Sequence, residues 1–433
     1  MERLQKMGIV IKQSIKSSLI SYIGIGLGFV NTILLFPKML SLEEFGLIKL
    51  LLSIVIIMMP ILQLNGSLVI TRFYPFFQND KKSLNSFISF VFALPVFGFL
   101  VLGVMFFLYK EQTVFWLFSE NSPLFVQYYW AVLPLAVFFV LSNLLETVIL
   151  SNLKSIVTTF FKTVVVRLLT TVIVICYFFD WIDQTTFVWL FVAIYAIQFF
   201  SLLVYFVSLT SYKWESPKHT LNSVHFKEIK KYMFLIFLGG GGAVIIAQVD
   251  SIMSSYKLGL EYTGIYTIAF FIAVVIEIPR RNIIQIVSPL LTKAIKNNDS
   301  AEMKVIYQKT ALNQFIASAF IFFLLAFNLS EIYSFFPKNE NFDMIQQGMP
   351  VVIIVGASFV FDMLMGCNTE IIHFSKIYYW NAILTPLLAI SAIGFNLYFI
   401  DIMDNGLLAI AYATMVTFLV HNLIRCGVIY YYF

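Results

Sequence analysis

Charged residues are scarce in this sequence. Only 12% of its 433 residues are charged, whereas 60% are hydrophobic, and the mean hydropathy is +0.89. A soluble protein of this length cannot bury so much apolar surface, so the composition excludes a soluble globular fold and indicates lipid as the solvent. Backbone polar groups in lipid are satisfied only in helices or closed barrels, and apolar runs of about 20 residues favour helices. We therefore predict an all-α multi-pass membrane protein.

Cysteines, phosphate-binding loops and long polar connections are also rare or absent. Cys176, Cys367 and Cys426 have neither disulfide nor metal-ligand spacing. No GxxxxGK[ST] sequence occurs, and the glycine run 239–242 opens an apolar span instead of following a strand. No connection is long enough for a catalytic or nucleotide-binding domain. We expect no enzymatic activity, no cofactor, no metal site and no ATP-driven transport by this chain alone.

Twelve apolar runs are long enough to cross about 30 Å of hydrocarbon. They occupy residues 17–38, 47–70, 86–108, 124–150, 155–179, 185–209, 232–255, 264–290, 311–328, 346–372, 377–400 and 406–430. Six lie on each side of a polar stretch. The predicted organisation is a six-helix lobe at 1–210, a cytoplasmic linker at 211–231 and a second, pseudo-symmetric six-helix lobe at 232–433.

A short internal repeat supports two halves of similar build. The segment 40–47, LSLEEFGL, matches 258–265, LGLEYTGI, without a gap at an offset of 218 residues, which is half of the chain. Each copy lies between two long apolar runs and is predicted to be a loop joining paired helices. An even number of spans per half makes the two repeats parallel, related by an axis along the membrane normal.

The distribution of positive charge predicts the orientation. With the N-terminus inside, few of the 28 Lys and Arg residues fall in outer connections. Those outer residues are Lys38, Lys49, Lys110, Lys257 and Lys338. Both termini are therefore expected in the cytoplasm, with an uncleaved first helix. The net charge of +5 is explained by this topology and by contact with anionic membrane lipids, so no nucleic-acid partner is expected.

Polar residues inside two spans are candidates for function. In the first span, Ser and Gly residues between 14 and 28 share one helical face with Asn31, which fits either close helix packing or the polar wall of a cavity. In the seventh span, Asp250 indicates function because acidic groups are costly in lipid. Two alternatives for Asp250 are a side chain that extends toward water and a pair with Lys257.

Arg167 is the most informative single residue. It lies about 18 Å from either end of the predicted span 155–179, which is mid-membrane. Lys162 and Glu146 are each eight residues from Lys154 on neighbouring antiparallel spans, so they are expected to neutralise each other. The neighbouring spans contain no acidic residue at the same predicted depth as Arg167. It is predicted to bind an anionic group bidentately, unless it pairs with Asp362 or Glu370 of the tenth span.

Prolines mark similar places in the two halves. Pro60 lies in the second span and Pro279 in the eighth, one position away from the repeat offset, and both predict a bend. Arg280 and Arg281 follow Pro279. Glu277 lies four residues before Arg281 and can pair with it on one helical face.

Several of these segments resemble one family. The stretch Gln248-Val-Asp250, then 257–259, 264–266 and Pro289, is similar to the middle of the polysaccharide biosynthesis proteins, the O-antigen type oligosaccharide flippases. The opening of the chain shows the same likeness. Its matching features are residues 17–28, Pro37, the Phe45-Gly46 pair, and Gly66 through Arg72-Phe73. Drug/cation antiporters and lipid II flippases of the same superfamily share the two-lobe plan.

The resemblance implies a flippase of the bacterial inner membrane. Such a protein moves a polyprenyl-diphosphate-linked oligosaccharide from the cytoplasmic to the outer leaflet by alternating access, and a polysaccharide polymerase is a candidate partner. The cavity must hold a diphosphate and a hydrophilic glycan, which calls for cations and polar stripes. The expected substrate contacts are Asn31, Arg72, Arg167, Arg280 and Arg281. The expected ion-coupling residues are Asp250, Glu277 and Asp362.

Two alternatives remain open from the sequence. An ion-coupled antiporter for cationic drugs requires uncompensated Asp or Glu, whereas Arg and Lys in or near the spans are at least as numerous here. A membrane-embedded glycosyltransferase or polymerase requires a large outer loop, and the outer loops are short. The polysaccharide flippase is therefore favoured over both.

Overall fold

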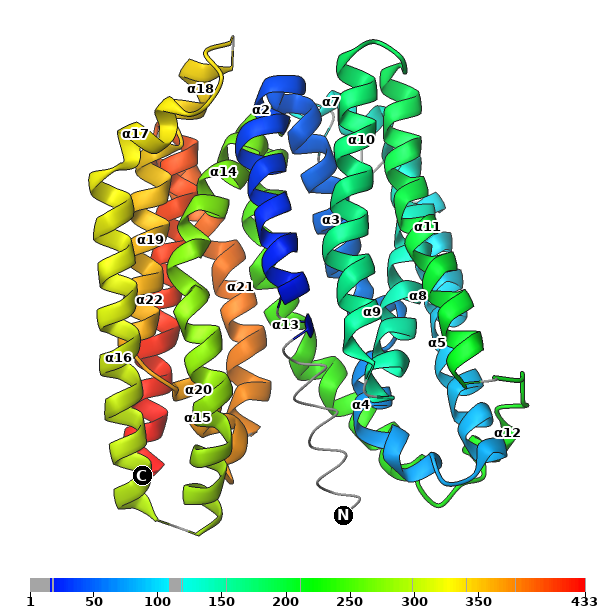
Figure 1. The fold of residues 1–433 in the computed structure, drawn as a ribbon. Coiled ribbons are helices and arrows are strands. Elements are labelled where there is room, and N and C mark those ends of the chain that lie inside the picture. Colours follow the sequence, from blue (N-terminus) through cyan, green and yellow to red (C-terminus); the bar gives the residue numbers. More distant parts are fainter. Residues whose placement is uncertain are drawn as a thin grey trace. The chain divides into compact units, whose positions relative to one another are not determined.

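The computed structural model describes residues 16–17, 19–108, 118, 120–152, 154–210, 212–297, 299–339, 341–377 and 379–432. The regular structure in these ranges is helical, with no strand (Figure 1). Eleven of the described helices are long and apolar enough to cross a membrane. The predicted all-α multi-pass membrane fold is confirmed.

The chain divides into two compact units. Unit 1 contains Met1–Leu40 and Leu51–Gly241, and unit 2 contains Ser41–Leu50 and Gly242–Phe433. The division runs through two long helices, α3 (Leu42–Leu62) and α13 (Phe226–Lys257). The predicted boundaries at 1–210, 211–231 and 232–433 stay a prediction.

Unit 1 begins with a membrane helix over Leu19–Met39, whose middle is a π-helix, η1 (Val30–Leu35), followed by α2 (Phe36–Met39). The elements after the unit 1 part of α3 are α4 (Gly66–Phe77), α5 (Lys81–Leu108), α7 (Pro123–Gln127), η3 (Tyr129–Ala131), α8 (Val132–Ser151), α9 (Ser155–Phe160), η4 (Phe161–Val165), α10 (Val166–Phe178), α11 (Gln184–Thr210) and α12 (Lys218–Leu221). Within this unit α8 packs against α4 and α11, and α10 packs against α11 (Figure 1).

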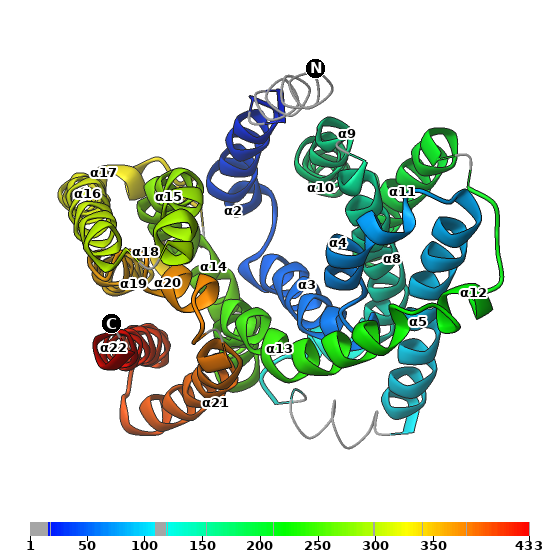
Figure 2. The same cartoon turned by 90° about the horizontal axis from the view of Figure 1, so that it is seen from below.

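Unit 2 contains the second part of α13 and the helices that follow it. These are α14 (Leu260–Ala273), η5 (Val274–Glu277), α15 (Ile278–Lys296), α16 (Ser300–Phe327), α17 (Leu329–Ser334), α18 (Phe342–Gln346), α19 (Met349–Leu364), α20 (Asn368–Phe374), α21 (Tyr379–Ile402) and α22 (Gly406–Tyr432). Here α19 packs against α14, α16 and α22, and α21 packs against α22, as the view in Figure 2 also shows.

Most predicted spans match a helix of the structure, and α13 occupies the predicted span 232–255. Four predicted spans are interrupted. Span 124–150 breaks after α7 and passes through the 3₁₀ turn η3 before α8. Span 47–70 breaks where Leu64 and Asn65 take positive φ, span 346–372 breaks at Gly366 with φ +64°, and span 264–290 tightens into η5 just before Pro279. The prolines do mark interruptions, since Pro60 lies in the last turn of α3 and Pro279 at the start of α15.

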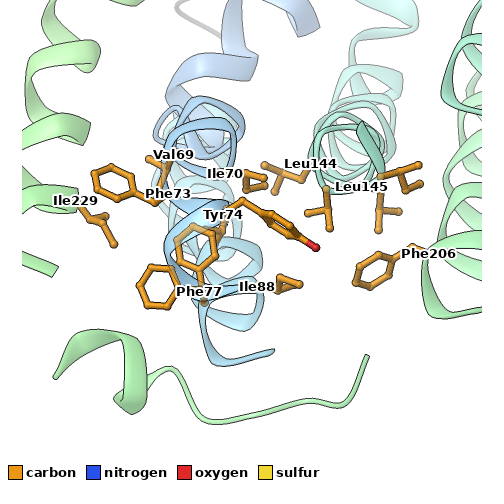
Figure 3. Packing of buried hydrophobic residues seen from close by; sticks show 14 of the residues in the cluster. Val69, Ile70, Phe73, Tyr74, Phe77, Ile88, Leu144, Leu145, Phe206 and Ile229 are labelled. Carbon is orange, nitrogen blue, oxygen red and sulfur yellow. The ribbon is translucent and has the colours of Figure 1, made fainter. Parts of the chain in front are cut away.

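The core of unit 1 forms around α4. One face of this helix buries Val69, Ile70, Phe73 and Phe77, which meet side chains from α5, α8, α11 and α13 (Figure 3). The residues at positions i, i+4 and i+8 along α4 place these groups on one stripe. Other residues of α4, such as Thr71 and Arg72, are exposed and can make contacts outside this core.

The two repeat copies pack against each other within unit 2. The predicted loops are short, and a helix begins inside each copy, at Leu42 in α3 and at Leu260 in α14. Ser41 and Glu44 form a capping box at the start of α3, with Ser41 N–H donating to Glu44 Oε2 at 2.9 Å and Glu44 N–H to Ser41 Oγ at 3.2 Å. The helix starts meet through reciprocal glycines: a Cβ on Gly46 would lie 1.9 Å from the Leu260 carbonyl oxygen, and one on Gly264 would lie 2.6 Å from that of Leu42.

This contact predicts that Gly46→Ala destabilises the protein. The added methyl would overlap a backbone carbonyl, so one helix start must shift, and overpacking of this kind costs about 1–3 kcal/mol. Thermal unfolding of the purified protein in detergent measures the effect. Gly26→Ala is the matched control, because a Cβ there meets nothing within 4 Å. Equal unfolding temperatures for the two variants would contradict the reciprocal packing.

Candidate functional sites in the membrane spans

Arg167 sits in the first turn of α10, directly after the π-helix η4. Its Nη1 donates to the carbonyl oxygen of Gly24 on the first membrane helix, and its guanidinium lies 2.8 Å from where a Cβ on Gly28 would be. None of the ion pairs among the described residues involves Arg167. The guanidinium is thus held by a neutral acceptor and has further N–H donors to offer.

Asn31 belongs to the same helix contact. It is 4% exposed, and its Nδ2 donates to the Arg167 carbonyl oxygen at 3.1 Å while its Oδ1 accepts from Thr171 Oγ1 at 2.8 Å. A Cβ on Gly24 would lie 2.6 Å from Thr163 Cβ. The small and polar face of the first span therefore serves close helix packing here. As a substrate contact, Asn31 stays a prediction, and the geometry favours a packing role.

The predicted pair of Lys162 and Glu146 is confirmed. Lys162 Nζ lies 2.9 Å from Glu146 Oε2, and Gln198 Nε2 donates to Glu146 Oε1 at 2.9 Å. The Glu146 side chain is 8% exposed and the Lys162 side chain 56% exposed. This acidic group is therefore fully compensated within unit 1.

Arg72 lies on the exposed side of α4. Its guanidinium carbon is 4.3 Å from the ring centroid of Tyr232 on α13 and 5.5 Å from that of Phe73. Cation–π contacts of this kind orient a guanidinium without neutralising it. Arg72 thus keeps its charge available.

In unit 2, Arg280 and Asp362 form a buried salt bridge between α15 and α19. Asn422 Nδ2 of α22 donates to the other carboxylate oxygen, Asp362 Oδ1, at 2.8 Å. Arg425, one turn further along α22, donates to Thr369 Oγ1 at 2.8 Å. Asp362, an alternative partner predicted for Arg167, is therefore engaged by Arg280. The Arg281 side chain, which carries another predicted contact, lies outside the described residues, and Glu277 closes the 3₁₀ turn η5.

Asp250 is surrounded by neutral donors from three helices of unit 2. Its Oδ2 accepts from the Tyr266 hydroxyl and the Thr414 hydroxyl, each at 2.7 Å, and its Oδ1 accepts from Asn396 Nδ2 at 3.2 Å. The proposed pair with Lys257 is wrong, because the Lys257 ammonium reaches Asp401 at 3.8 Å. The long Lys257 side chain extends to the end of α21 instead.

A positively charged residue, Lys49, also lies near Asp250. Lys49 was assigned to an outer connection, but it lies inside α3, donates to Gln248 Oε1 at 3.3 Å and acts electrostatically on Asp250. Asn396 and Thr414 also escaped prediction. The available signal was an amide within the apolar span 377–400, since amides in lipid need partners, and Asn396 is indeed 0% exposed.

The described residues contain no group of three or more His, Cys, Asp and Glu side chains that could hold a metal ion. The charged side chains within the spans can interact electrostatically with a substrate or an ion. Two embedded acids, Glu146 and Asp362, have cationic partners, whereas Arg167 has a carbonyl partner and Asp250 neutral donors. Unit 1 can therefore offer a cation to an anionic group, and unit 2 can offer a carboxylate to a proton or a cation.

No protein-family model matches the chain, and no curated protein matches its sequence. Solved structures do match its fold. An inward-facing multidrug resistance MATE family transporter of the MOP superfamily aligns with a TM-score of 0.73 at 13% identity, covering 94% of this chain and 93% of that one. The lipid II flippase MurJ, in an inward closed conformation, aligns with a TM-score of 0.74 at 15% identity, covering 96% and 87%.

A third structure extends this likeness. A MOP superfamily transporter from Pyrococcus furiosus aligns with a TM-score of 0.55 at 14% identity, covering 97% of this chain and 92% of that chain. At these identities the likeness concerns the fold. The chain therefore has the fold of MOP superfamily transporters over nearly its whole length.

Proposed function

We propose that this protein is a flippase that moves a polyprenyl-diphosphate-linked oligosaccharide from the cytoplasmic to the outer leaflet of the bacterial inner membrane. The fold likeness to the lipid II flippase MurJ supports a lipid-linked substrate. The short resemblance to oligosaccharide flippases around Asp250 supports a polysaccharide precursor. The proposal includes cytoplasmic termini, a six-plus-six organisation with a linker at 211–231, no enzymatic activity, and a polysaccharide polymerase as partner.

The observation that carries the proposal is the state of Arg167. Its guanidinium is held in the middle of a membrane-spanning helix by one carbonyl oxygen, and no ion pair among the described residues neutralises it. A guanidinium presents parallel N–H donors that match two oxygens of a phosphate. A diphosphate headgroup meets that requirement, and a cationic drug does not.

The contacts of the other proposed residues support their roles to different extents. Arg72 keeps its charge beside Tyr232, so it suits an anionic substrate. Arg280 is committed to Asp362, so a substrate phosphate would have to compete with that carboxylate. We propose Asp250, Glu277 and Asp362 as ion-coupling residues. Asp250 suits this role best, because the side chains that hydrogen-bond to it are neutral.

The test is the sidedness of the lipid-linked oligosaccharide in cells that lack this chain and carry a variant in its place. With Arg167→Ala, we expect the intermediate to accumulate facing the cytoplasm and outward delivery to fall by about tenfold or more. Loss of hydrogen bonds to a charged group removes about 1.5–3 kcal/mol, which corresponds to that factor. An outside-only lectin or hydrolase measures the exposed glycan.

Lys154→Ala is the matched control, because it removes one positive charge from the exposed start of the same helical hairpin. It should leave delivery unchanged. Normal delivery by cells without the chain, combined with sensitivity to cationic toxicants, would overturn the proposal in favour of the cation antiporter.

A further inference from the structure

A groove lined by uncharged side chains lies in unit 1 between α4 and α8. It has a volume of about 500 Å³, which lies within the range of roughly 300–1,000 Å³ for small-molecule sites. Its lining residues come from these two helices and the residue after α4. They are Ser67, Leu68, Thr71, Tyr74 and Pro75 from α4, Gln78 directly after it, and Asn143, Thr147, Leu150 and Ser151 from α8. Most are hydroxyl or amide side chains, and none is charged.

The groove is built on two helical stripes. Thr71 on α4 and Gln78 directly after it are exposed, whereas Val69, Ile70 and Phe73 form the buried stripe of α4. On α8 the polar residues recur every four positions, at Asn143, Thr147 and Ser151. α8 lies in a membrane span, Tyr129–Ser151. This stripe gives α8 a face within the span that can contact water or a polar ligand.

Three hydroxyl groups of the groove are positioned as acceptors. Thr71 Oγ1 donates to the Ser67 carbonyl at 2.9 Å, Thr147 Oγ1 to the Asn143 carbonyl at 2.8 Å and Ser151 Oγ to the Thr147 carbonyl at 2.9 Å. Each hydroxyl proton is thereby used within its own helix, and the oxygen lone pairs remain free for donors from a ligand. This arrangement suits a ligand that is rich in O–H and N–H groups.

Two amides supply the complementary donors. Asn143 Oδ1 accepts from Gln63 Nε2 at 3.4 Å, whereas its Nδ2 has no acceptor within the part of the chain that the structure describes. Gln78 is exposed and its side chain makes no hydrogen bond to another described residue. Tyr74 lines the groove, with its hydroxyl fixed by Asn152 Nδ2 at 2.8 Å, and its side chain extends from α4 toward α8 (Figure 3).

We infer that this groove binds the glycan of the lipid-linked substrate. The inference rests on the proposed function and names the surface that distinguishes a sugar-bearing lipid from the bare lipid diphosphate. Neutral acceptors and amide donors beside an aromatic ring match sugar hydroxyl and acetamido groups. They provide no cation for the diphosphate and no carboxylate for a cationic drug, so the groove has a chemistry distinct from that of Arg167.

The experiment measures binding to the purified full chain in nanodiscs. One probe is a short-chain polyprenyl diphosphate carrying a trisaccharide of N-acetylglucosamine, and the other is the same lipid diphosphate without sugar. We expect the wild-type protein to bind the sugar-bearing probe about tenfold more tightly, as two or three net hydrogen bonds would give. Asn143→Leu combined with Thr147→Val should reduce that preference to below about threefold while the affinity for the bare lipid is unchanged.

Matched variants distinguish the loss of a sugar contact from damage to the fold. Thr210→Val is the control, since Thr210 Oγ1 donates to the Phe206 carbonyl at 2.8 Å in the same geometry as Thr147, but lies outside the groove. Gln78→Leu tests the groove at an exposed position that folding does not require, and it should also weaken the preference for the sugar-bearing probe. Unfolding temperatures are recorded for every variant.

The outcomes distinguish the groove from the function. If wild-type protein binds neither probe, the flippase proposal fails and the groove inference falls with it. If it binds both probes equally, or if Asn143→Leu/Thr147→Val and Gln78→Leu both keep the wild-type preference, the groove inference fails alone. Equal weakening of both probes would also overturn it, because the groove would then act on the diphosphate or the fold.

Discussion

Removal of Arg280 alone, or of Asp362 alone, should destabilise the protein far more than removal of both. The pair is buried, with side-chain exposures of 19% and 6%. Breaking a buried pair leaves an uncompensated charge and costs about 3–5 kcal/mol, whereas replacing both partners by apolar residues of similar size is often nearly neutral. We therefore expect Arg280→Met and Asp362→Leu each to lower stability strongly and the double variant to recover most of the loss.

The surroundings predict an order for the two single variants. Arg425 lies near enough to act electrostatically with both Arg280 and Asp362. Loss of Asp362 leaves two neighbouring arginines that share the charge of Glu370, and the Asn422 amide also loses its acceptor. Loss of Arg280 leaves Asp362 with Asn422 and the nearby charge of Arg425. Asp362→Leu should consequently be the more damaging change.

A double-mutant cycle on the unfolding free energy measures this coupling. The control cycle uses Lys257→Met and Asp401→Leu, whose partners are 3.8 Å apart with side-chain exposures of 31% and 68%. An exposed pair contributes about 0–1 kcal/mol, so the control cycle should show little coupling. Additive losses at Arg280 and Asp362 would contradict the pairing.

The sequence predicted most membrane spans because a run of apolar residues is a local property. It missed the breaks at Leu64 and Gly366, since a residue with positive φ leaves no trace in a hydrophobic run unless the turn chemistry around it is recognised. Gly366 offered such a signal, as glycine adopts this conformation readily. Leu64 itself offered none, because positive φ is unusual for a leucine, but the Asn65-Gly66 dipeptide directly after it is a turn signal.

Charge pairing was predictable where the chain itself sets the distance. Lys162 and Glu146 flank one tight hairpin at equal depth, so their contact followed from counting residues. The partners of Asp250 lie on α14, α21 and α22, up to 164 residues away, and only tertiary packing brings them together. The same limitation explains the incorrect pairing of Asp250 with Lys257, which had the right spacing on one helix but another carboxylate within reach.

The interpretation of small residues required the structure. A stripe of serine and glycine in a membrane helix fits a packed interface as well as a cavity wall. The distances at Gly24 and Gly28, and the engagement of both ends of the Asn31 amide, favour packing. The neutral groove between α4 and α8 was not predicted, because its residues fall on two helices. Each stripe alone resembles the scattered polar side chains that are common in membrane helices.

Replacement of Asp250 by Asn should abolish gradient-driven transport while the fold is retained. The carboxyl group accepts hydrogen bonds from Tyr266, Thr414 and Asn396, which hold it between three helices. Lys49 acts electrostatically on this buried acid, and a proton or cation supplied by the gradient can also bind to it. An Asn side chain has nearly the same shape but cannot carry the charge, and its NH₂ group displaces one of the three donors.

Transport of the sugar-bearing lipid into proteoliposomes, under an imposed proton or sodium gradient, measures this effect. We expect Asp250→Asn to reduce gradient-stimulated transport by about a hundredfold, which corresponds to about 2.7 kcal/mol, and to leave unstimulated binding of the lipid unchanged. Thr414→Val removes one donor of the same cluster, worth about 1 kcal/mol, and should cost about fivefold. Asp401→Asn is the control, because that carboxylate is exposed at the end of α21 and should not respond to the gradient. Full gradient stimulation in Asp250→Asn would contradict a coupling role for Asp250.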